Sequence, residues 1–381
     1  MIIRGAMVHD GVNRDAYEAD IRISGGKIAQ IGAGIAADGE KEFDARGLLA
    51  YPGFVEAHGH SGLDGYGIGY EGADYNEMND VLSPQLRALD AIEPRDPALK
   101  EAREAGVTTM CIGPGSANVL GGTFCAFKPV GVRIDDMWLR PEVAMKCAFG
   151  ENPKRCYREK GVSTRMTTAS KLRETLFKAK EYAEKIQRAG GDEQKMPAFD
   201  MKLHAMLPVI RGEMPLKAHA HQADDILTAV RIAKEFGVKL TLEHCTEGHL
   251  IAEELAKENL PLAVGPTMTH ATKFELRNIS WQTPGALSRA GCKVSIITDS
   301  PVIEQKYLPL CAALAIKGGM DPFEALRAIT INPAAHIGLA DRIGSIEVGK
   351  DADIVLADGS IFALATCVVQ VFIDGAPVIE A

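Results

Sequence analysis

The sequence has no excess of basic residues. Its 42 lysines and arginines are outnumbered by 51 aspartates and glutamates, so the formal net charge is −9 at pH 7. Binding to nucleic-acid phosphates needs a basic face, and this composition argues against nucleic acid as a partner. The sequence also lacks an uninterrupted apolar run of the ~18 residues that a membrane helix needs. We therefore expect no membrane association.

Paired cysteine motifs are missing as well. The eight cysteines are scattered and none forms a Cys-x-x-Cys pair, which disfavours a disulfide framework or a structural zinc knot. The first residues, Met1-Ile2-Ile3-Arg4-Gly5, lack the basic segment and apolar run of a secretory leader. We therefore expect a cytoplasmic protein with reduced thiols.

Both ends of the chain contain short β-like runs separated by turn residues. The N-terminal runs lie at 1–8, 19–24, 27–31 and 43–49, and the C-terminal runs at 344–350, 352–356 and 368–373. Neither end has enough apolar residues for a core of its own. We expect residues 1–52 and 345–381 to pair into one small β-sandwich domain beside a larger domain at 53–344.

Strand-like apolar runs alternate with amphipathic segments in the middle of the chain. Helices are expected at 168–188, before Gly190-Gly191, and at 224–236, before Gly237. Strands are expected at 107–112, 216–221, 239–244 and 293–298. Such alternation predicts an α/β fold with a parallel sheet, and about seven or eight units suit a (β/α)8 TIM-like barrel.

Several expected strands end in side chains that bind metals. His58 and His60 alternate at the end of the run 52–60, and alternate residues share one face of a strand. Taken alone, this pair is as compatible with core histidines as with metal binding. Similar residues end other strands, namely His219 with His221, His244, and Asp299. Imidazole and carboxylate ligands on one face of a barrel suit zinc.

With these motifs the chain resembles the amidohydrolase superfamily of metal-dependent barrel hydrolases, nearest to its imidazolonepropionase-like group. The resemblance runs nearly end to end. Besides the strand ends, it is carried by Asp44-Ala45-Arg46-Gly47, Pro52-Gly53-Phe54-Val55, Asn332-Pro333-Ala334-Ala335 and Gly344-Ser345-Ile346-Glu347-Val348-Gly349-Lys350. It implies one or two divalent metals per chain, with zinc as the expected metal.

The resemblance also implies roles for individual residues. His58 and His60 become ligands of the more buried metal, and His219 and His244 become ligands of a second metal. Asp299 becomes a metal ligand and the catalytic proton acceptor.

The group that bridges two metals stays open between two residues. Binuclear relatives use a carboxylated lysine, and Lys146 lies in the apolar run 143–149, where one is expected. Burial of an ammonium lowers its pKa and yields the neutral amine that carboxylation requires. Lys146 could instead reach solvent from a strand end. Glu151 is the rival bridge or a substrate contact, although a Gly-Glu-Asn-Pro stretch is ordinarily a turn.

Other side chains are candidate substrate contacts, each equally compatible with an ordinary core or loop position. They are His221, Glu151, Asn118, Arg155 and His270. In mononuclear deaminases and imidazolonepropionase a catalytic glutamate follows the fifth-strand histidine by three positions, and Gln222 stands there in this chain. An amide does not shuttle protons as a carboxylate does. Glu56 replaces the usual aspartate before the first histidine pair.

Together these features predict a metal-dependent hydrolase of a small-molecule substrate. Water activated by the metal would attack an amide or cyclic amide C–N bond of non-peptide or dipeptide type. A mononuclear deaminase or a cyclic-amidine hydrolase of imidazolonepropionase type is the first alternative. A non-catalytic barrel scaffold is the second. Assembly into a homo-oligomer stays open.

Overall fold

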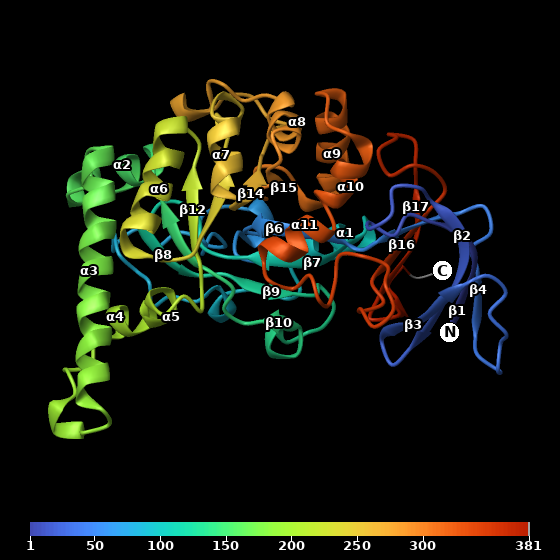
Figure 1. The fold of residues 1–381 in the computed structure, drawn as a ribbon, viewed down its shortest axis with the longest axis horizontal. Helices are drawn as coiled ribbons and strands as arrows, with labels where there is room; N and C mark the ends of the chain where they lie inside the picture. Colours follow the sequence, from blue (N-terminus) through green and yellow to red (C-terminus); the bar gives the residue numbers. More distant parts are fainter. Residues whose placement is uncertain (380–381) are drawn as a thin grey trace.

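The computed structural model describes residues 1–379, which form three β-sheets and a layer of helices (Figure 1). The first sheet, called the end sheet, has the strand order β18-β17-β16-β5-β1-β2-β3, with β4 beside β1. Its strands are β1 (Ile2–Val8), β2 (Tyr17–Ser24), β3 (Lys27–Gly32), β4 (Glu42–Asp44), β5 (Leu49–Pro52), β16 (Ile354–Ala357), β17 (Val368–Ile373) and β18 (Ala376–Pro377).

The end sheet is built from both ends of the chain. Strands β5 and β16 run antiparallel, with Leu49 opposite Ala357. Ile3 and Ile21 from the first half pack with Phe372 from the second half in one buried cluster. Figure 1 shows both termini on this side of the molecule. The apolar faces of the two halves therefore cover each other.

The remaining strands form two further sheets, with the orders β10-β9-β7-β6 and β15-β14-β13-β12-β11-β8. Strands β6 and β7 are parallel, and β11 to β15 are parallel in succession. The strands are β6 (Phe54–Gly59), β7 (Val107–Ile112), β8 (Leu120–Thr123), β9 (Cys125–Phe127), β10 (Trp138–Arg140), β11 (Met145–Ala148), β12 (Leu216–Ala220), β13 (Leu240–His244), β14 (Pro261–Val264) and β15 (Lys293–Ile296).

Strands β8 and β9 are successive pieces of one segment, and they depart from the expected βα repeat. Strand β9 is antiparallel to β7, and β8 is antiparallel to β11, so the segment joins the two sheets. The link from β7 to β8 spans only residues 113–119, a Gly- and Pro-containing stretch too short for a crossover helix. Strands β15 and β6 are the other pair of neighbouring ends of the two sheets. The backbone N–H groups of Ile296 in β15 and Val55 in β6 donate hydrogen bonds to the carbonyl oxygens of Ala328 and Ile329, respectively.

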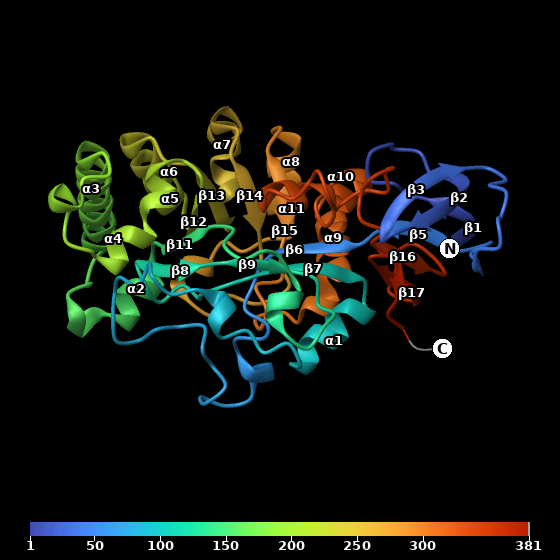
Figure 2. The same ribbon diagram turned by 90° about the horizontal axis from the view of Figure 1, so that it is seen from below.

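Helices lie along the outer side of these strands, and α6, α7 and α8 form a row in Figures 1 and 2. The helices are α1 (Pro97–Glu104), α2 (Glu151–Cys156), α3 (Arg165–Ala189), α4 (Met201–Ala205), α5 (Leu207–Ile210), α6 (Ala223–Phe236), α7 (Ala252–Glu258), α8 (Gln282–Arg289), α9 (Leu308–Lys317), α10 (Pro322–Arg327) and α11 (Ile331–His336). The strands beneath them are buried on both faces, as expected of a covered parallel sheet.

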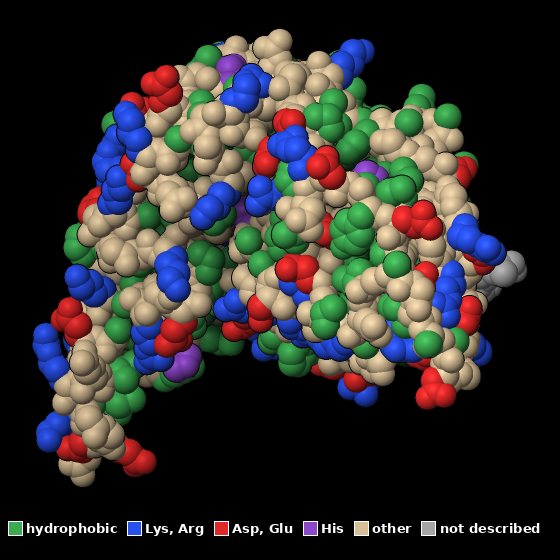
Figure 3. All heavy atoms as spheres, turned by 45° about the vertical axis from the view of Figure 1, so that its right-hand side comes forward, with side chains coloured by type: hydrophobic (Ala, Val, Ile, Leu, Met, Phe, Trp, Pro, Cys, Tyr) green, Lys and Arg blue, Asp and Glu red, His purple; other side chains and the backbone are tan. Residues whose placement is uncertain are grey.

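The two helices predicted from periodicity are confirmed. Helix α6 turns Ile226, Val230 and Ala233 inward, and it ends where Gly237 adopts a left-handed φ of 67°. Helix α3 likewise ends at Gly190, with a φ of 57°. None of the helices within residues 1–379 is both long and apolar enough to cross a membrane. Figure 3 shows basic and acidic side chains interspersed over one face of the molecule.

Candidate metal centre

Six of the predicted side chains converge at the carboxyl ends of the parallel strands. His58 lies in β6 and His60 just beyond it, His219 lies in β12 and His221 just beyond it, His244 ends β13, and Asp299 follows β15. All five histidines are buried, and the Asp299 side chain is 16% exposed. This end of a parallel α/β sheet is where barrel enzymes place their active sites.

Each of the five histidines is held through its Nδ1 atom. The partners are Glu243 Oε2 for His58 (3.0 Å), Gly113 O for His60 (2.7 Å), Ser116 Oγ for His219 (2.8 Å), Thr246 Oγ1 for His221 (2.7 Å) and Gly265 O for His244 (2.9 Å). A partner at Nδ1 fixes the ring and leaves the Nε2 lone pair for a ligand. The Nε2 atoms of His219 and His244 are buried without a hydrogen-bond partner.

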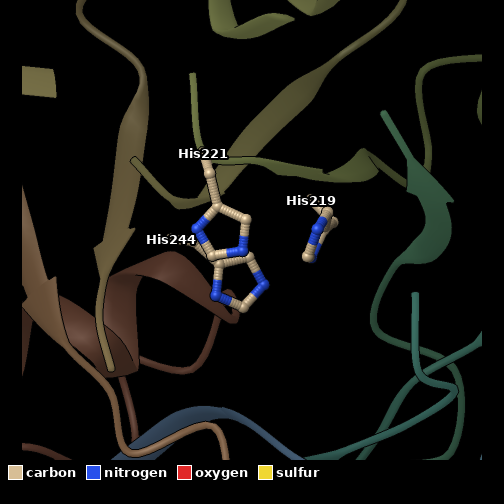
Figure 4. A group of neighbouring side chains, drawn as sticks. All are labelled: His219, His221 and His244. Atoms are coloured by element: carbon tan, nitrogen blue, oxygen red, sulfur yellow. The ribbon is translucent and has the colours of Figure 1, made fainter. Parts of the chain in front are cut away.

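The side chains fall into two overlapping groups. In one, ligand atoms of His219, His221 and His244 lie within 4.8 Å of one another (Figure 4). In the other, His58, His244 and Asp299 meet the same limit. His60 joins the second group, because its Nε2 lies 3.3 Å from Asp299 Oδ1. His244 belongs to both groups, so the two groups are contiguous.

The protein environment favours the neutral form of these histidines and the ionised form of Asp299, which are the forms that bind a cation. Burial lowers the pKa of His58, His219 and His221 well below the usual range and that of His244 to about 4. Burial alone would raise the pKa of Asp299, but the adjacent imidazoles hold it well below its usual range. The centre therefore offers neutral imidazoles and one carboxylate near neutral pH, as metal binding requires.

Two of the ligand candidates have strained backbones. His244 has a φ of 74° and Asp299 a φ of 53°, both in the left-handed region that favours glycine. Each such conformation costs on the order of 1–3 kcal/mol and persists only where the surrounding structure holds it. Strain of this kind is concentrated at functional sites, and here it aims two side chains at the same centre.

Lys146 lies at the floor of this centre. Its side chain is fully buried, its Nζ is 3.1 Å from His58 Nε2, and it lies over the Phe124 ring. Burial lowers the pKa of Lys146 to about 8. A substantial fraction of the amine is therefore neutral near pH 8, and only the neutral amine reacts with carbon dioxide.

Glu243 supports the centre from below. It accepts hydrogen bonds from His58 Nδ1 and His336 Nε2, the latter at 2.9 Å, and pairs with Lys217 Nζ at 2.9 Å. Burial would raise the pKa of Glu243, but Lys217 and His336 hold it well below its usual range. This buried carboxylate therefore stays charged and orients the His58 ring.

The comparisons with known proteins agree with this geometry. Residues 49–378 match the Amidohydrolase family. The chain belongs to this family. The family comprises hydrolases that act on carbon–nitrogen bonds other than linear peptide bonds.

Individual relatives of this amidohydrolase cover it to different extents. A crystal structure of an amidohydrolase from Thermotoga maritima is 39% identical, with a TM-score of 0.96 over 100% of both chains. Amidohydrolase tasK of Hapsidospora irregularis is 27% identical over 96% of this chain and 40% of its own length. An imidazolonepropionase of Symbiobacterium thermophilum is 34% identical over 37% of this chain and 33% of its own length. The chain thus spans less than half the length of these two curated relatives.

The residues of this amidohydrolase fit a divalent metal. The buried Nε2 atoms of His219 and His244 have no hydrogen-bond partner, and within residues 1–379 Asp299 is the carboxylate that lies beside His58, His60 and His244. Histidine and carboxylate donors of this kind suit zinc. Glu56 adds support between β6 and β15, because it accepts from Thr298 N and Oγ1 at 3.0 and 2.6 Å. Burial raises the pKa of Glu56 to about 8.

The remaining predicted residues lie in varied settings. The Asn118 amide donates to Glu77 O and Asp80 O and meets Tyr157 Oη, so it has no donor left for a substrate. Arg155 and His270 are exposed. Gln222 begins α6 and faces the Arg277 guanidinium.

Sequence reasoning missed the residue that contacts both Glu151 and the histidines. Glu275 is 1% exposed, and its Oε1 lies 3.5 Å from His219 Nε2 and 3.7 Å from His221 Nε2. Its Oε2 accepts a hydrogen bond from the Glu151 N–H at 2.8 Å. Glu275 lies in the long connection from β14 to α8, where its only sequence signal is an acidic residue between Phe274 and Leu276.

Proposed function

We propose that this amidohydrolase hydrolyses an amide or cyclic amide C–N bond, of non-peptide or dipeptide type, in a small-molecule substrate. The reaction would use one or two divalent metals per chain, with zinc as the preferred ion. The observation that carries the proposal is the convergence of five buried histidines, each held at Nδ1, with the ionised carboxylate of Asp299 beside three of them.

The positions of the side chains assign them different roles in the proposed reaction. His58, His60 and Asp299 would hold one metal, and His219 and His244 would hold the other. When bound, zinc supplies Lewis acidity towards the substrate carbonyl and lowers the pKa of water. Asp299, which stays ionised, accepts the proton of the attacking water and passes it to the leaving nitrogen.

Lys146 is proposed to bridge the two metals as a carbamate. The Lys146 amine lies 3.1 Å from His58 Nε2, and its charge lowers the pKa of His58, His219 and His244. A carbamate replaces this positive charge by a negative charge and two oxygens that can hold two cations. Glu151 is less suited to the bridge, because its own Oε2 lies against the backbone N–H of Glu275.

A second candidate function has the relative's name and the fold in its favour. The similarity to an imidazolonepropionase supports a cyclic-amidine or deaminase reaction at the same site. Gln222 argues against it, because the position that needs a proton-transferring carboxylate carries an amide. Ring opening of cyclic amidines or deamination of amino-substituted heterocycles, with amide substrates left uncleaved, would favour this second candidate. A non-catalytic scaffold is disfavoured by the intact ligand set.

The proposal extends to the organisation of the molecule. We propose that residues 53–344 act as one closed metal-dependent barrel, with β8–β9 as its antiparallel member. Residues 1–52 and 345–379 would form the second domain through the end sheet, and residues 380 and 381 of the expected domain lie outside the described residues. A cytoplasmic location fits the dispersed cysteines, and no nucleic acid is expected as partner for a chain of net charge −9.

The test combines metal analysis with a substrate panel. Protein purified without chelator is expected to contain zinc and to release amine from members of a panel of N-acyl amino acids, dipeptides and cyclic amides. His58→Ala and His60→Ala should lose metal and activity while far-ultraviolet circular dichroism stays unchanged. His204→Ala, on the exposed face of α4, is the control. Full metal content in His58→Ala and His60→Ala would show that the site is wrongly assigned.

A further inference from the structure

A buried carboxylate approaches the second histidine group from a loop outside the strand ends. Glu275 lies in the short helical turn Phe274–Leu276, between β14 and α8. Its Oε1 is 3.5 Å from His219 Nε2 and 3.7 Å from His221 Nε2. The Glu275 Oε1 and His219 Nε2 atoms are both buried without a hydrogen-bond partner. The Glu275 oxygen has the charge of Lys273 Nζ at 2.6 Å, but His219 Nε2 has no partner, and a buried ring nitrogen left unsatisfied is costly and favours a bound cation.

The spacing of these atoms fits a shared cation. A tetrahedral zinc ion with bonds of about 2.0–2.1 Å holds its ligand atoms about 3.3–3.4 Å apart. The two measured separations are close to this value. The third imidazole is also in place, because ligand atoms of His219, His221 and His244 lie within 4.8 Å of one another (Figure 4). Three imidazoles are thus close to one another, and the Glu275 carboxylate lies beside two of them.

The approach of Glu275 is built into the fold. Its Oε2 accepts a hydrogen bond from the backbone N–H of Glu151, at the start of α2, and this bond turns Oε1 towards the histidines. Gly150 makes room for it, because a Cβ there would lie 2.4 Å from Glu275 Oε2. Gly150 also has a φ of 79°, which side chains rarely adopt. Gly150 and Glu151, at the start of α2, therefore hold the Glu275 carboxylate in position.

Lys273 supplies a competing positive charge. Its Nζ lies 2.6 Å from Glu275 Oε1, and it also donates a hydrogen bond to Asn152 Oδ1 at 3.1 Å. The Lys273 side chain is 17% exposed, so it can move towards solvent. A metal ion and this ammonium would thus compete for the same carboxylate oxygen.

We propose that Glu275 and His221 are protein ligands of the second metal, together with His219 and His244. The inference rests on the proposed function and deepens it. His221 is then a metal ligand rather than a substrate contact, and Lys273 weakens metal binding at the second site.

Zinc binding tests the proposal without an activity assay. Glu275→Gln keeps an acceptor for the Glu151 N–H but removes the charge. In a chelator-competition titration with zinc alone, Glu275→Gln should bind the second equivalent at least about tenfold more weakly. The cobalt-loaded protein should show a changed visible absorption spectrum. Lys273→Met should bind the second zinc as tightly as the unmodified protein or more tightly.

The matched control is Glu247→Gln. Glu247 is also a buried carboxylate near the strand ends, but its oxygens accept from Ala223 N at 2.9 Å and Asn278 Nδ2 at 2.8 Å. This variant should keep both zinc affinities. A merely structural role for Glu275 predicts a different pattern. Lys273→Met would then weaken binding of the second zinc as much as Glu275→Gln does, because either change breaks the same ion pair.

The outcomes separate the two proposals. If the unmodified protein binds no zinc, the proposed function fails. If it binds zinc and Glu275→Gln binds the second equivalent with unchanged affinity, only the assignment of Glu275 fails. Thermal unfolding of the metal-free proteins accompanies the titration, and an unfolded Glu275→Gln is replaced by Glu275→Asp, which draws the carboxylate back and should weaken the second site alone.

Discussion

Two regions of the molecule bury a lysine, and they shift its pKa in opposite directions. At the junction with the end sheet, Lys128 Nζ lies 2.9, 2.9 and 2.6 Å from Asp351, Asp353 and Asp374. Burial would lower the pKa of Lys128, but these carboxylates raise it. At the metal centre, Lys146 contacts an imidazole, and burial lowers its pKa to about 8. Partners, and not burial alone, decide whether a buried lysine is a fixed cation or a reactive amine.

A third lysine sharpens the difference. Lys217 in β12 is the register partner of Lys146 in β11, is equally buried, and lies over the same Phe124 ring. It differs in having the Glu243 carboxylate at 2.9 Å. Two lysines at equivalent positions of neighbouring strands thus receive different roles from one carboxylate.

The largest expected effect is at Lys146. Lys146→Ala should reduce the metal content from about two per chain to one or none and lower kcat/KM by more than about a hundredfold, because the proposed bridge is lost. Plasma mass spectrometry of the purified variant measures the metal, and added short carboxylic acids should partly restore it. Glu151→Ala is the comparison. Loss of metal in that variant, with both metals kept in Lys146→Ala, would reverse the assignment.

Lys128 should matter for stability instead. Lys128→Met leaves buried carboxylates without their cation and should lower the free energy of unfolding by about 3–5 kcal/mol. Urea denaturation measures the change. Lys100→Met, whose side chain is 65% exposed, should change it by less than about 0.5 kcal/mol. An equal loss in both variants would mean that the partners of Lys128 contribute nothing.

The carboxylates around Lys128 should also titrate unusually. Burial raises the pKa of Asp353 to about 6. The folded protein therefore holds this proton after the unfolded chain has released it, so the stability gained is full below about pH 4 and is lost as the pH rises to about 6. Relative to Asp353→Asn, the unmodified protein should lose about 3 kcal/mol over this interval. Unfolding at several pH values measures the difference, and a constant difference would contradict the shift.

The smallest effect is expected for an exposed lysine that also has a carboxylate partner. Lys185 lies 2.9 Å from Glu181 on α3, and both side chains are more than half exposed. Because water and salt screen such a pair, Lys185→Met should change the free energy of unfolding by about 0.5 kcal/mol or less. A larger change would mean that an ion pair contributes to the free energy of unfolding whether or not it is buried.

Local pattern predicted much of the fold and of the site. The helices α3 and α6 follow from apolar periodicity and terminal glycines, and the histidines of β6, β12 and β13 stand where alternating strands place them. The antiparallel β8–β9 segment was missed, because Gly121 and Gly122 interrupt a run that has no helix before it. Spacing alone does not distinguish a parallel strand from an antiparallel one.

The residues that support the site, Glu243 and Glu275, were not predicted from the sequence for a different reason. Glu243 meets His58 across 185 positions of sequence, and Glu275 meets Glu151 across 124. Such pairs have no common local pattern, since they exist only once the strands are side by side. An acidic residue on a strand or in a loop is ordinarily solvated, and burial, which makes these two important, is a property of the completed fold.

The strand order of the end sheet dictates when the molecule can be completed. Strand β5 lies between β1 and β16, yet β16 follows β5 by about three hundred residues in the chain. During synthesis, β5 therefore presents an unpaired edge until the residues between β5 and β16 have emerged. Edges of this kind are templates for intermolecular pairing, and contacts of such long sequence separation form slowly. Newly made chains are thus most exposed to aggregation, and most dependent on chaperones, just before β16 is added.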